Sequence, residues 1–102
     1  MDYIEAAENA KNVFGGDLIT ADREMLYLFN KGVNDDNFDV VMDLLTTFKI
    51  YKRLDLRRNN ISDASLRRIY DFLLYNEHLI DVKYDWHLST NLTFLLNKNK
   101  MF

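Results

Sequence analysis

The feature that most constrains this chain is a match of the sequence with itself at a shift of 28 residues. Apolar residues fall on apolar residues in one unbroken register through the central part of the chain. Self-similarity at a fixed period of about 20 to 50 residues is typical of proteins built from stacked repeats. The aligned apolar pairs are Val33 with Ile61, Phe38 with Leu66, Val41 with Ile69, Met42 with Tyr70, Leu44 with Phe72, Leu45 with Leu73, Tyr51 with Leu79, Leu54 with Val82, and Leu56 with Tyr84.

Each repeat has a short first part and a longer second part. In the middle repeat, Leu54 and Leu56 alternate with charged residues, which is the pattern of a half-buried strand. Leu66 and Ile69 then recur at helical spacing, after Ser62 as a suitable N-cap. A strand, a helix and a return to the next strand in phase make a right-handed parallel crossover. We therefore predict an α/β fold, with a small parallel sheet on one side and helices on the other.

The middle repeat resembles a known family. Its sequence Leu54-x-Leu56-x-x-Asn59-x-Ile61, followed by a long helical half, is similar to the leucine-rich repeat of the ribonuclease-inhibitor type. Repeats of that type have about 28 or 29 residues. The side-chain amide of such an Asn can satisfy backbone groups where the chain turns out of the strand. The resemblance extends over residues 23–90 and implies a short leucine-rich-repeat solenoid.

The repeats on either side depart from this pattern. Lys31 occupies the Asn position of the first repeat, with Asn30 one place earlier, and His87 occupies it in the third. Tyr84 replaces a Leu in the third repeat. Atypical terminal repeats are expected, because the ends of a solenoid need polar outer faces.

The chain is predicted to form a single domain with an N-terminal cap. Residues 3–14 have the pattern of an amphipathic helix that ends at Gly15 and Gly16. The predicted parts of the domain 1–102 are a cap helix with its connection (1–22) and repeats at 23–50, 51–78 and 79–102. One alternative stays open. Residues 21–30 contain Ala, Glu, Met and Leu, which favour helix, and the first repeat would then lack its strand.

Composition narrows the class of protein. The chain is 48% apolar and 28% charged, as in an ordinary soluble domain, and it contains no Cys. The net charge of −3 argues against a general nucleic-acid binder. No apolar run approaches the ~18 residues of a membrane span, and the N-terminus does not resemble a signal peptide. We therefore expect a cytoplasmic or otherwise intracellular protein that does not enter a membrane.

No catalytic or metal-binding pattern is evident. His78 and His87 are the two histidines, and neither belongs to a motif such as H-E-x-x-H. Gly15-Gly16 lacks the further glycines of a phosphate loop, and Asp35-Asp36 with Asp39 lacks the alternating ligands of a calcium loop. We expect no enzyme activity, cofactor or bound metal.

The candidate site is the row of strand residues that alternate with the buried leucines. Such residues line the concave, protein-binding face of a solenoid. Here they combine aromatic side chains with Arg and Asp, which is the chemistry of interface hot spots, and neighbouring arginines could bind a partner carboxylate. The candidate protein-binding residues are Tyr27, Phe29, Arg53, Asp55, Arg57, Arg58, Lys83, Asp85 and Trp86.

Two simpler interpretations of these residues stay open. Asp55, Arg57, Lys83 and Asp85 could form a solvated, ion-paired surface whose members each contribute little to binding. Trp86 could cover the open end of the apolar core instead of contacting a partner.

These observations favour a protein–protein interaction module, an adaptor or an inhibitor whose partner the sequence does not identify. One alternative is a structural subunit that self-associates through open sheet edges, at Tyr27 on one side and Lys83 on the other. Another is a small viral or mobile-element inhibitor of a host protein.

Overall fold

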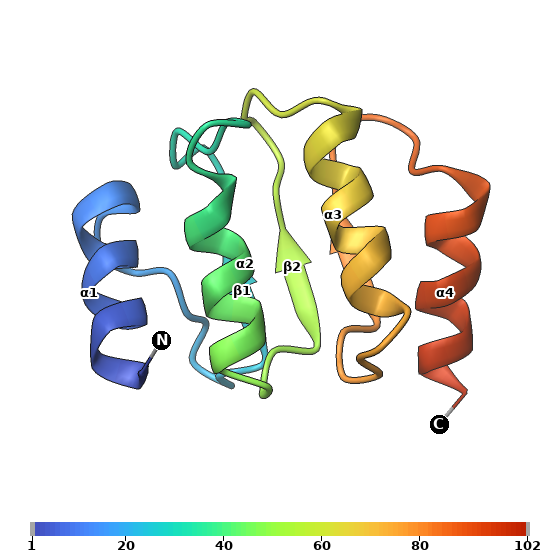
Figure 1. Cartoon of the computed structure of the whole chain (residues 1–102), viewed down its shortest axis with the longest axis horizontal. Coiled ribbons are helices and arrows are strands. Elements are labelled where there is room, and N and C mark those ends of the chain that lie inside the picture. Colours follow the sequence, from blue (N-terminus) through green and yellow to red (C-terminus); the bar gives the residue numbers. More distant parts are fainter. Residues whose placement is uncertain (1, 102) are drawn as a thin grey trace.

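The computed structural model describes residues 2–101, which form four helices and three strands in alternation after the first helix. In Figure 1 the helices stand side by side in chain order, with the strands behind them. The elements are α1 (Tyr3–Phe14), β1 (Met25–Tyr27), α2 (Phe38–Thr47), β2 (Arg53–Asp55), α3 (Asp63–Leu73), β3 (Asp81–Lys83) and α4 (Thr90–Lys100).

The three strands form one parallel sheet in the order β1-β2-β3. Leu26 pairs with Leu54, and Leu54 pairs with Val82, so each strand is displaced from the next by the 28 residues of the sequence repeat. The predicted α/β class, the parallel sheet and its register are confirmed. Of the two possibilities for residues 21–30, the structure contains the strand, because Met25–Tyr27 is β1.

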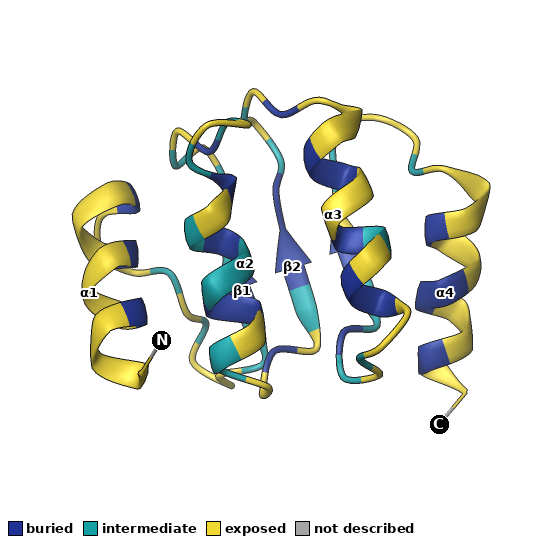
Figure 2. Ribbon diagram, viewed as in Figure 1, coloured by how far each residue is buried: buried dark blue, intermediate teal, exposed yellow. Residues whose placement is uncertain are grey.

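The core lies between the sheet and the helices. Leu26 and Leu54 are fully buried and Val82 is 5% exposed, because these side chains point from the strands toward the helices. Each helix turns one buried stripe toward the core and exposes its other side to solvent (Figure 2). The helical residues that complete the core include Ala6, Ala10, Phe14, Phe38, Val41, Leu44, Leu45, Leu66, Ile69, Phe72, Leu73, Leu92, Leu95 and Leu96.

The helix ends follow from local sequence. The Asp2 carboxylate accepts a hydrogen bond from the Glu5 amide (2.8 Å) at the start of α1. Gly15 ends that helix with φ = 86°, a left-handed conformation that glycine adopts at little cost. Ser62 and Ser89 cap α3 and α4, and their hydroxyls accept from backbone amides of the first turn. The predicted N-terminal helix and the predicted Ser62 cap are both confirmed.

The side chain of Asn59 joins two consecutive repeats. Its Nδ2 donates to the carbonyls of Leu28 (2.7 Å), Leu56 (3.0 Å) and Arg57 (3.1 Å). Its Oδ1 accepts from the amides of Val33 (2.9 Å) and Lys31 (3.2 Å). One amide group therefore satisfies backbone groups in the turns after both β1 and β2, as expected for an Asn side chain in a turn.

A second link between repeats is made by Asp35. Its carboxylate accepts from the Ser62 amide (3.0 Å), the Ser62 hydroxyl (2.7 Å) and the Ser65 hydroxyl (2.6 Å). These hydrogen bonds, the one from the Ser62 amide first, hold the pKa of Asp35 below its ordinary value. The bonds fix the loop before α2 against the N-terminus of α3.

The two sheet edges differ, and for one of them our expectation was wrong. The β1 edge at Tyr27 is not open, because the preceding segment pairs with it in antiparallel orientation through a bridge between Ile19 and Leu26. The Tyr27 amide donates to the Leu18 carbonyl (2.6 Å), and the Thr20 amide donates to the Met25 carbonyl (3.3 Å). The connection 17–20 therefore also protects this edge.

We predict that Asn59→Ala lowers the free energy of unfolding by about 2–4 kcal/mol, because buried backbone groups of two turns lose their partners. Urea denaturation measures the change. The matched control is Asn60→Ala, since the Asn60 side chain is exposed and makes no hydrogen bond within residues 2–101. Equal stability of the two variants would contradict the bridging role.

Candidate functional site: the open face of the sheet

The candidate site is the face of the sheet that the helices do not cover, called the open face below. Side chains alternate along a strand, so the neighbours of the buried leucines point to this side. The open face comprises the outward-pointing residues of the three strands and, in each case, the residue two places after the end of the strand. These are Met25, Tyr27, Phe29, Arg53, Asp55, Arg57, Asp81, Lys83 and Asp85. The structure thus brings the candidate residues from the three strands together on one surface.

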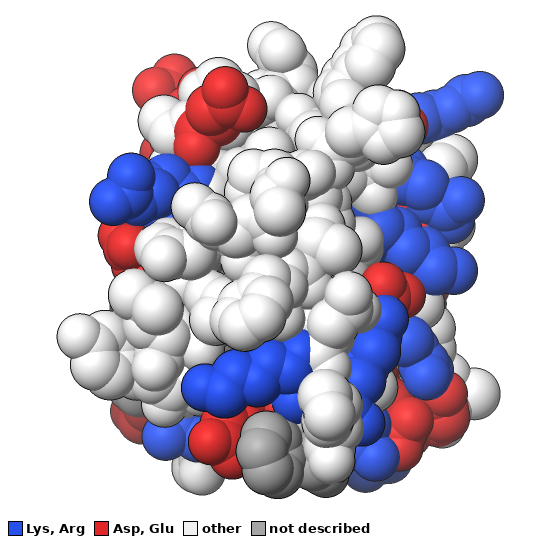
Figure 3. All heavy atoms as spheres, turned by 90° about the vertical axis from the view of Figure 1, so that its right-hand side faces the viewer, with Lys and Arg blue, Asp and Glu red and all other residues white. Residues whose placement is uncertain are grey.

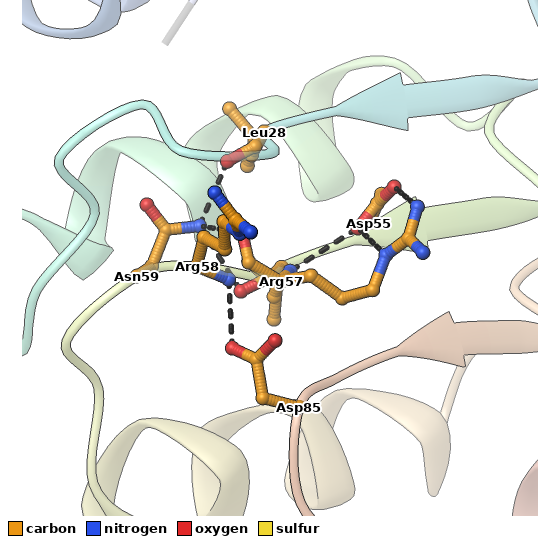
Figure 4. A network of polar contacts seen from close by, with 7 residues as sticks. Leu28, Asp55, Arg57, Arg58, Asn59 and Asp85 are labelled. Carbon is orange, nitrogen blue, oxygen red and sulfur yellow. Dashed lines mark hydrogen bonds and ion pairs between the residues drawn. The ribbon is translucent and has the colours of Figure 1, made fainter.

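Asp55 lies at the centre of this face but is not accessible. The residue is 1% exposed, because the Arg57 side chain lies along it. Arg57 donates from Nε to Asp55 Oδ1 (3.0 Å) and from an η-nitrogen to Oδ2 (2.8 Å), and its backbone amide also donates to Oδ1 (3.1 Å). Figure 4 shows this bidentate contact between the Arg57 guanidinium and the Asp55 carboxylate. The expectation that Asp55 is a surface contact residue is therefore wrong.

The environment of Asp55 favours its charged form. Burial by itself raises the pKa of this carboxyl, but the hydrogen bonds and positive charge of Arg57, with the charge of Lys83, outweigh it. The result is a pKa below the ordinary value of 3.8. Arg57 is also held charged, since the Asp55 carboxylate raises the pKa of its guanidinium. The Arg57 guanidinium, which we expected to bind a partner carboxylate, already binds Asp55.

An aromatic and guanidinium cluster covers the end of the face that follows the strands. The Phe29 ring stacks on Tyr27 with a centroid distance of 6.0 Å and an interplanar angle of 18°. The guanidinium carbons of Arg57 and Arg58 lie over the same Phe29 ring, at 5.3 Å and 5.6 Å from its centroid. Cation–π contacts of this kind hold a flexible Arg side chain in a defined position.

Arg58 differs from Arg57 in being free to bind an anion. Among residues 2–101 its guanidinium has no ion-pair partner. Its backbone has φ = 57°, a left-handed conformation that is costly for a residue with a long side chain. The Asp85 carboxylate accepts from the Arg58 amide (2.7 Å) and stabilises this turn (Figure 4). Asn30, 28 residues earlier, has nearly the same φ of 52°.

The opposite end of the face is neutralised by its own ion pairs. Arg53 contacts Asp22 at 2.7 Å and Glu24 at 3.7 Å, and Lys52 contacts Glu24 at 3.3 Å. Hydrogen bonds from Thr20 and from the Glu24 amide, with the contact to Arg53, lower the pKa of Asp22. The charge of Arg53 is therefore neutralised by Asp22 and Glu24. Of the four residues for which we considered an ion-paired surface, Asp55 and Arg57 form such a pair.

Trp86 and Lys83 are accessible. Trp86 is 74% exposed, so its side chain does not cover the core. Leu92, Leu95 and Leu96 of α4 close the core at that end instead. Lys83 is exposed on β3. Both residues remain available to a partner.

The two histidines lie in different surroundings. His78 packs edge-on against Phe72, with ring centroids 5.4 Å apart, and its Nε2 is buried without a hydrogen-bond partner. Burial is the main cause that lowers the pKa of His78. His87 is exposed. Within residues 2–101, no three His, Cys, Asp or Glu side chains are grouped so that they could hold a metal ion.

Sequence reasoning missed three features of this surface. It did not identify the pairing of Asp55 with Arg57, although residues two apart on a strand share a face. It also missed Asp22 as a partner of Arg53, because that contact spans 31 residues and depends on the course of a loop. The role of Phe29 as a support for two arginines had no signal in the sequence.

Comparisons of the chain with models of protein families, with curated proteins and with solved structures find no significant match. The helices within residues 2–101 all lack the length and apolar character needed to cross a membrane.

We predict that Asp55→Asn lowers the free energy of unfolding at pH 7 by about 1–3 kcal/mol, because Arg57 loses a charged acceptor. A carboxyl whose pKa is depressed by folding stabilises the protein above its unfolded-state pKa, and this contribution is lost as pH falls through the folded-state pKa. The difference between wild type and variant should therefore be largest at pH 7 and should shrink as the pH falls below 3.8 toward the lowered folded-state pKa of Asp55, as measured by urea denaturation over this pH range. A difference that does not change with pH would contradict the assigned contact.

Proposed function

We propose that this chain is a short leucine-rich-repeat solenoid of the ribonuclease-inhibitor type that binds another protein through the open face of its sheet. It acts without catalysis, as an adaptor or an inhibitor. The partner presents an acidic segment with apolar side chains.

The support for the repeat family comes from the register and from Asn59. Parallel strands 28 residues apart, each followed by a helix, reproduce the period of that repeat type. The Asn of the resembling motif bonds to backbone groups of two turns, which is the role that the motif implies. The terminal repeats lack this Asn, as the sequence already indicates.

The observation that carries the binding proposal is the state of Arg58. Its guanidinium pairs with no carboxylate among residues 2–101, and it lies over the Phe29 ring at a turn whose backbone is strained. Strained residues persist where the surrounding structure holds them, and they gather at binding sites. An Arg fixed in this way loses little conformational entropy when it binds a carboxylate.

The surroundings of Arg58 specify the chemistry of the partner. Lys83 is exposed on the same face, whereas the carboxylate of Asp55 is already neutralised by Arg57. Arg58 and Lys83 together outnumber the one exposed carboxylate at this end of the face, that of Asp85, so the net charge there is positive and favours an acidic partner segment. Trp86 supplies a large exposed apolar surface, and Trp and Arg are the residue types most enriched among binding hot spots.

The test is affinity capture from extracts of the native cells with wild type and with the variant Arg58→Glu, Trp86→Ala. We expect wild type to retain a partner that the variant loses, by at least tenfold in a direct binding assay with the purified partner, because two hot-spot contacts are removed. Binding should weaken as salt is raised, since the Arg58 contact is electrostatic.

The matched control is Arg67→Glu, Tyr75→Ala, which makes the same kinds of change outside the open face. Arg67 lies on α3 and Tyr75 follows it, and both are exposed. Circular dichroism establishes that both variants are folded. Loss of the partner only in the control would place the binding site on the helical side, and retention by both variants would also contradict the proposal.

A further inference from the structure

The row of helices ends in α1 on one side of the molecule and in α4 on the other (Figure 1). Beyond β3 the sheet has no further strand within residues 2–101. α4 projects past that strand on the helix side, so a molecule that approaches this end of the protein meets α4 first (Figure 1). The outer faces of α1 and α4 are therefore the surfaces through which the row of helices can be continued.

The outer face of α4 combines an exposed aromatic ring with little charge. Phe94 lies about opposite the buried Leu92 and Leu96 on the helix and is 66% exposed. Viewed from this end, the molecule shows a broad uncharged surface with basic side chains beside and below it (Figure 3). The end units of a stack of repeats stay soluble through polar outer faces. An exposed Phe at such an end is a side chain that the next unit of a stack would cover.

The two end helices carry unlike charges. The charged residues of α4 are Lys98 and Lys100 near its end, and none is acidic. α1 has Glu5 and Glu8 in its first half and one cation, Lys11, further along. All five side chains are exposed, and none forms an ion pair among residues 2–101. Electrostatic complementarity therefore favours contact between unlike ends.

We propose that copies of this chain associate head to tail, with the outer face of α4 in one copy packed against the outer face of α1 in the next. The contact continues the row of helices that already exists within the chain. Because it joins two different surfaces, it does not close after two copies and gives linear oligomers. Both surfaces lie at the ends of the row, so the open face stays accessible and this association is independent of partner binding there.

The directions of the two helices bring the unlike charges together. α1 begins and α4 ends at the lower side of the molecule in Figure 1, so the two helices are antiparallel. A shift along the longest axis then places the first half of α1 beside the last half of α4 without overlap, because these helices are the outermost elements. They have 12 and 11 residues, so they can pair over nearly their whole lengths. Glu5 and Glu8 come level with Lys98, and the exposed Ile4 comes level with Met101.

Contact between two α4 helices lacks this complementarity. It would bring Lys98 and Lys100 of both copies into one interface, and α4 supplies no carboxylate to balance them. Like charges in contact weaken an interface. The head-to-tail contact instead places the two lysines of α4 near the two glutamates of α1, and it covers Phe94 at the same time.

The experiment is sedimentation velocity at concentrations up to about 1 mM, because a contact between two short helices is small and the association is weak. Wild type is compared with an α1 variant (Glu5→Lys, Glu8→Lys), an α4 variant (Lys98→Glu, Lys100→Glu) and the variant with all four changes. Wild type should sediment faster as its concentration rises. Each two-residue variant puts like charges in the contact and should weaken association at least tenfold. The fourfold variant restores unlike charges and should associate like wild type.

The matched control is Asp36→Lys, Asp43→Lys, which changes the net charge as much as the α1 variant does. Asp36 precedes α2 and Asp43 lies on it, away from both end faces. This control should associate like wild type, and circular dichroism checks that every variant is folded. A control that associates as weakly as the α1 variant would assign the effect to net charge and overturn the proposal.

An equimolar mixture of the α1 variant and the α4 variant gives a further distinction. The two altered ends then match each other, and the two unaltered ends match as in wild type, so the mixture should form oligomers that neither variant forms alone. A wild type that is monomeric at all concentrations, an α1 variant that associates like wild type, or a mixture or fourfold variant that stays monomeric would each overturn the proposal. None of these results depends on capture of a partner by Arg58.

Discussion

The structure depends on the constraint that the turns after two neighbouring strands share one side chain. Parallel strands leave their turns side by side, and backbone groups in those turns that the ladder does not pair need other partners. The Asn59 amide supplies both donors and an acceptor to these groups, so it fixes the spacing of the first two repeats. His87 occupies the corresponding position after β3 and is exposed. Lys31 occupies it after β1, so of the three repeats the middle one supplies this amide.

Most of the fold could be predicted because it repeats. The pairing of Leu26, Leu54 and Val82 follows from the 28-residue self-match, and a strand displaced by one residue would bury the wrong side chains. The helix starts at Ser62 and Tyr3 also follow from short-range capping signals. The closure of the β1 edge could not be predicted, because the segment Leu18–Thr20 has no pattern of a strand and pairs only through its backbone.

The candidate site was predictable as a surface but not as a set of contacts. Strand alternation places Tyr27, Asp55 and Lys83 on one face, and the structure agrees. Which charges on that face remain free depends on side-chain geometry that a sequence does not contain. Asp55 binds Arg57. The backbone at Arg58 is left-handed, the Arg58 guanidinium lies over the Phe29 ring, and no carboxylate among residues 2–101 forms an ion pair with it. For this reason we propose Arg58, and not Arg57, as the arginine that binds a carboxylate of the partner.

The most direct test of this account is nuclear magnetic resonance measurement of hydrogen exchange at the side-chain amides of Asn59 and Asn60. The account predicts that the Asn59 Nδ2 protons exchange slowly, because the carbonyls of two turns hold them. The Asn60 protons should exchange as in an exposed side chain. Equally fast exchange at both residues would mean that Asn59 does not join the repeats, and it would contradict the shared register on which the sheet and its open face depend.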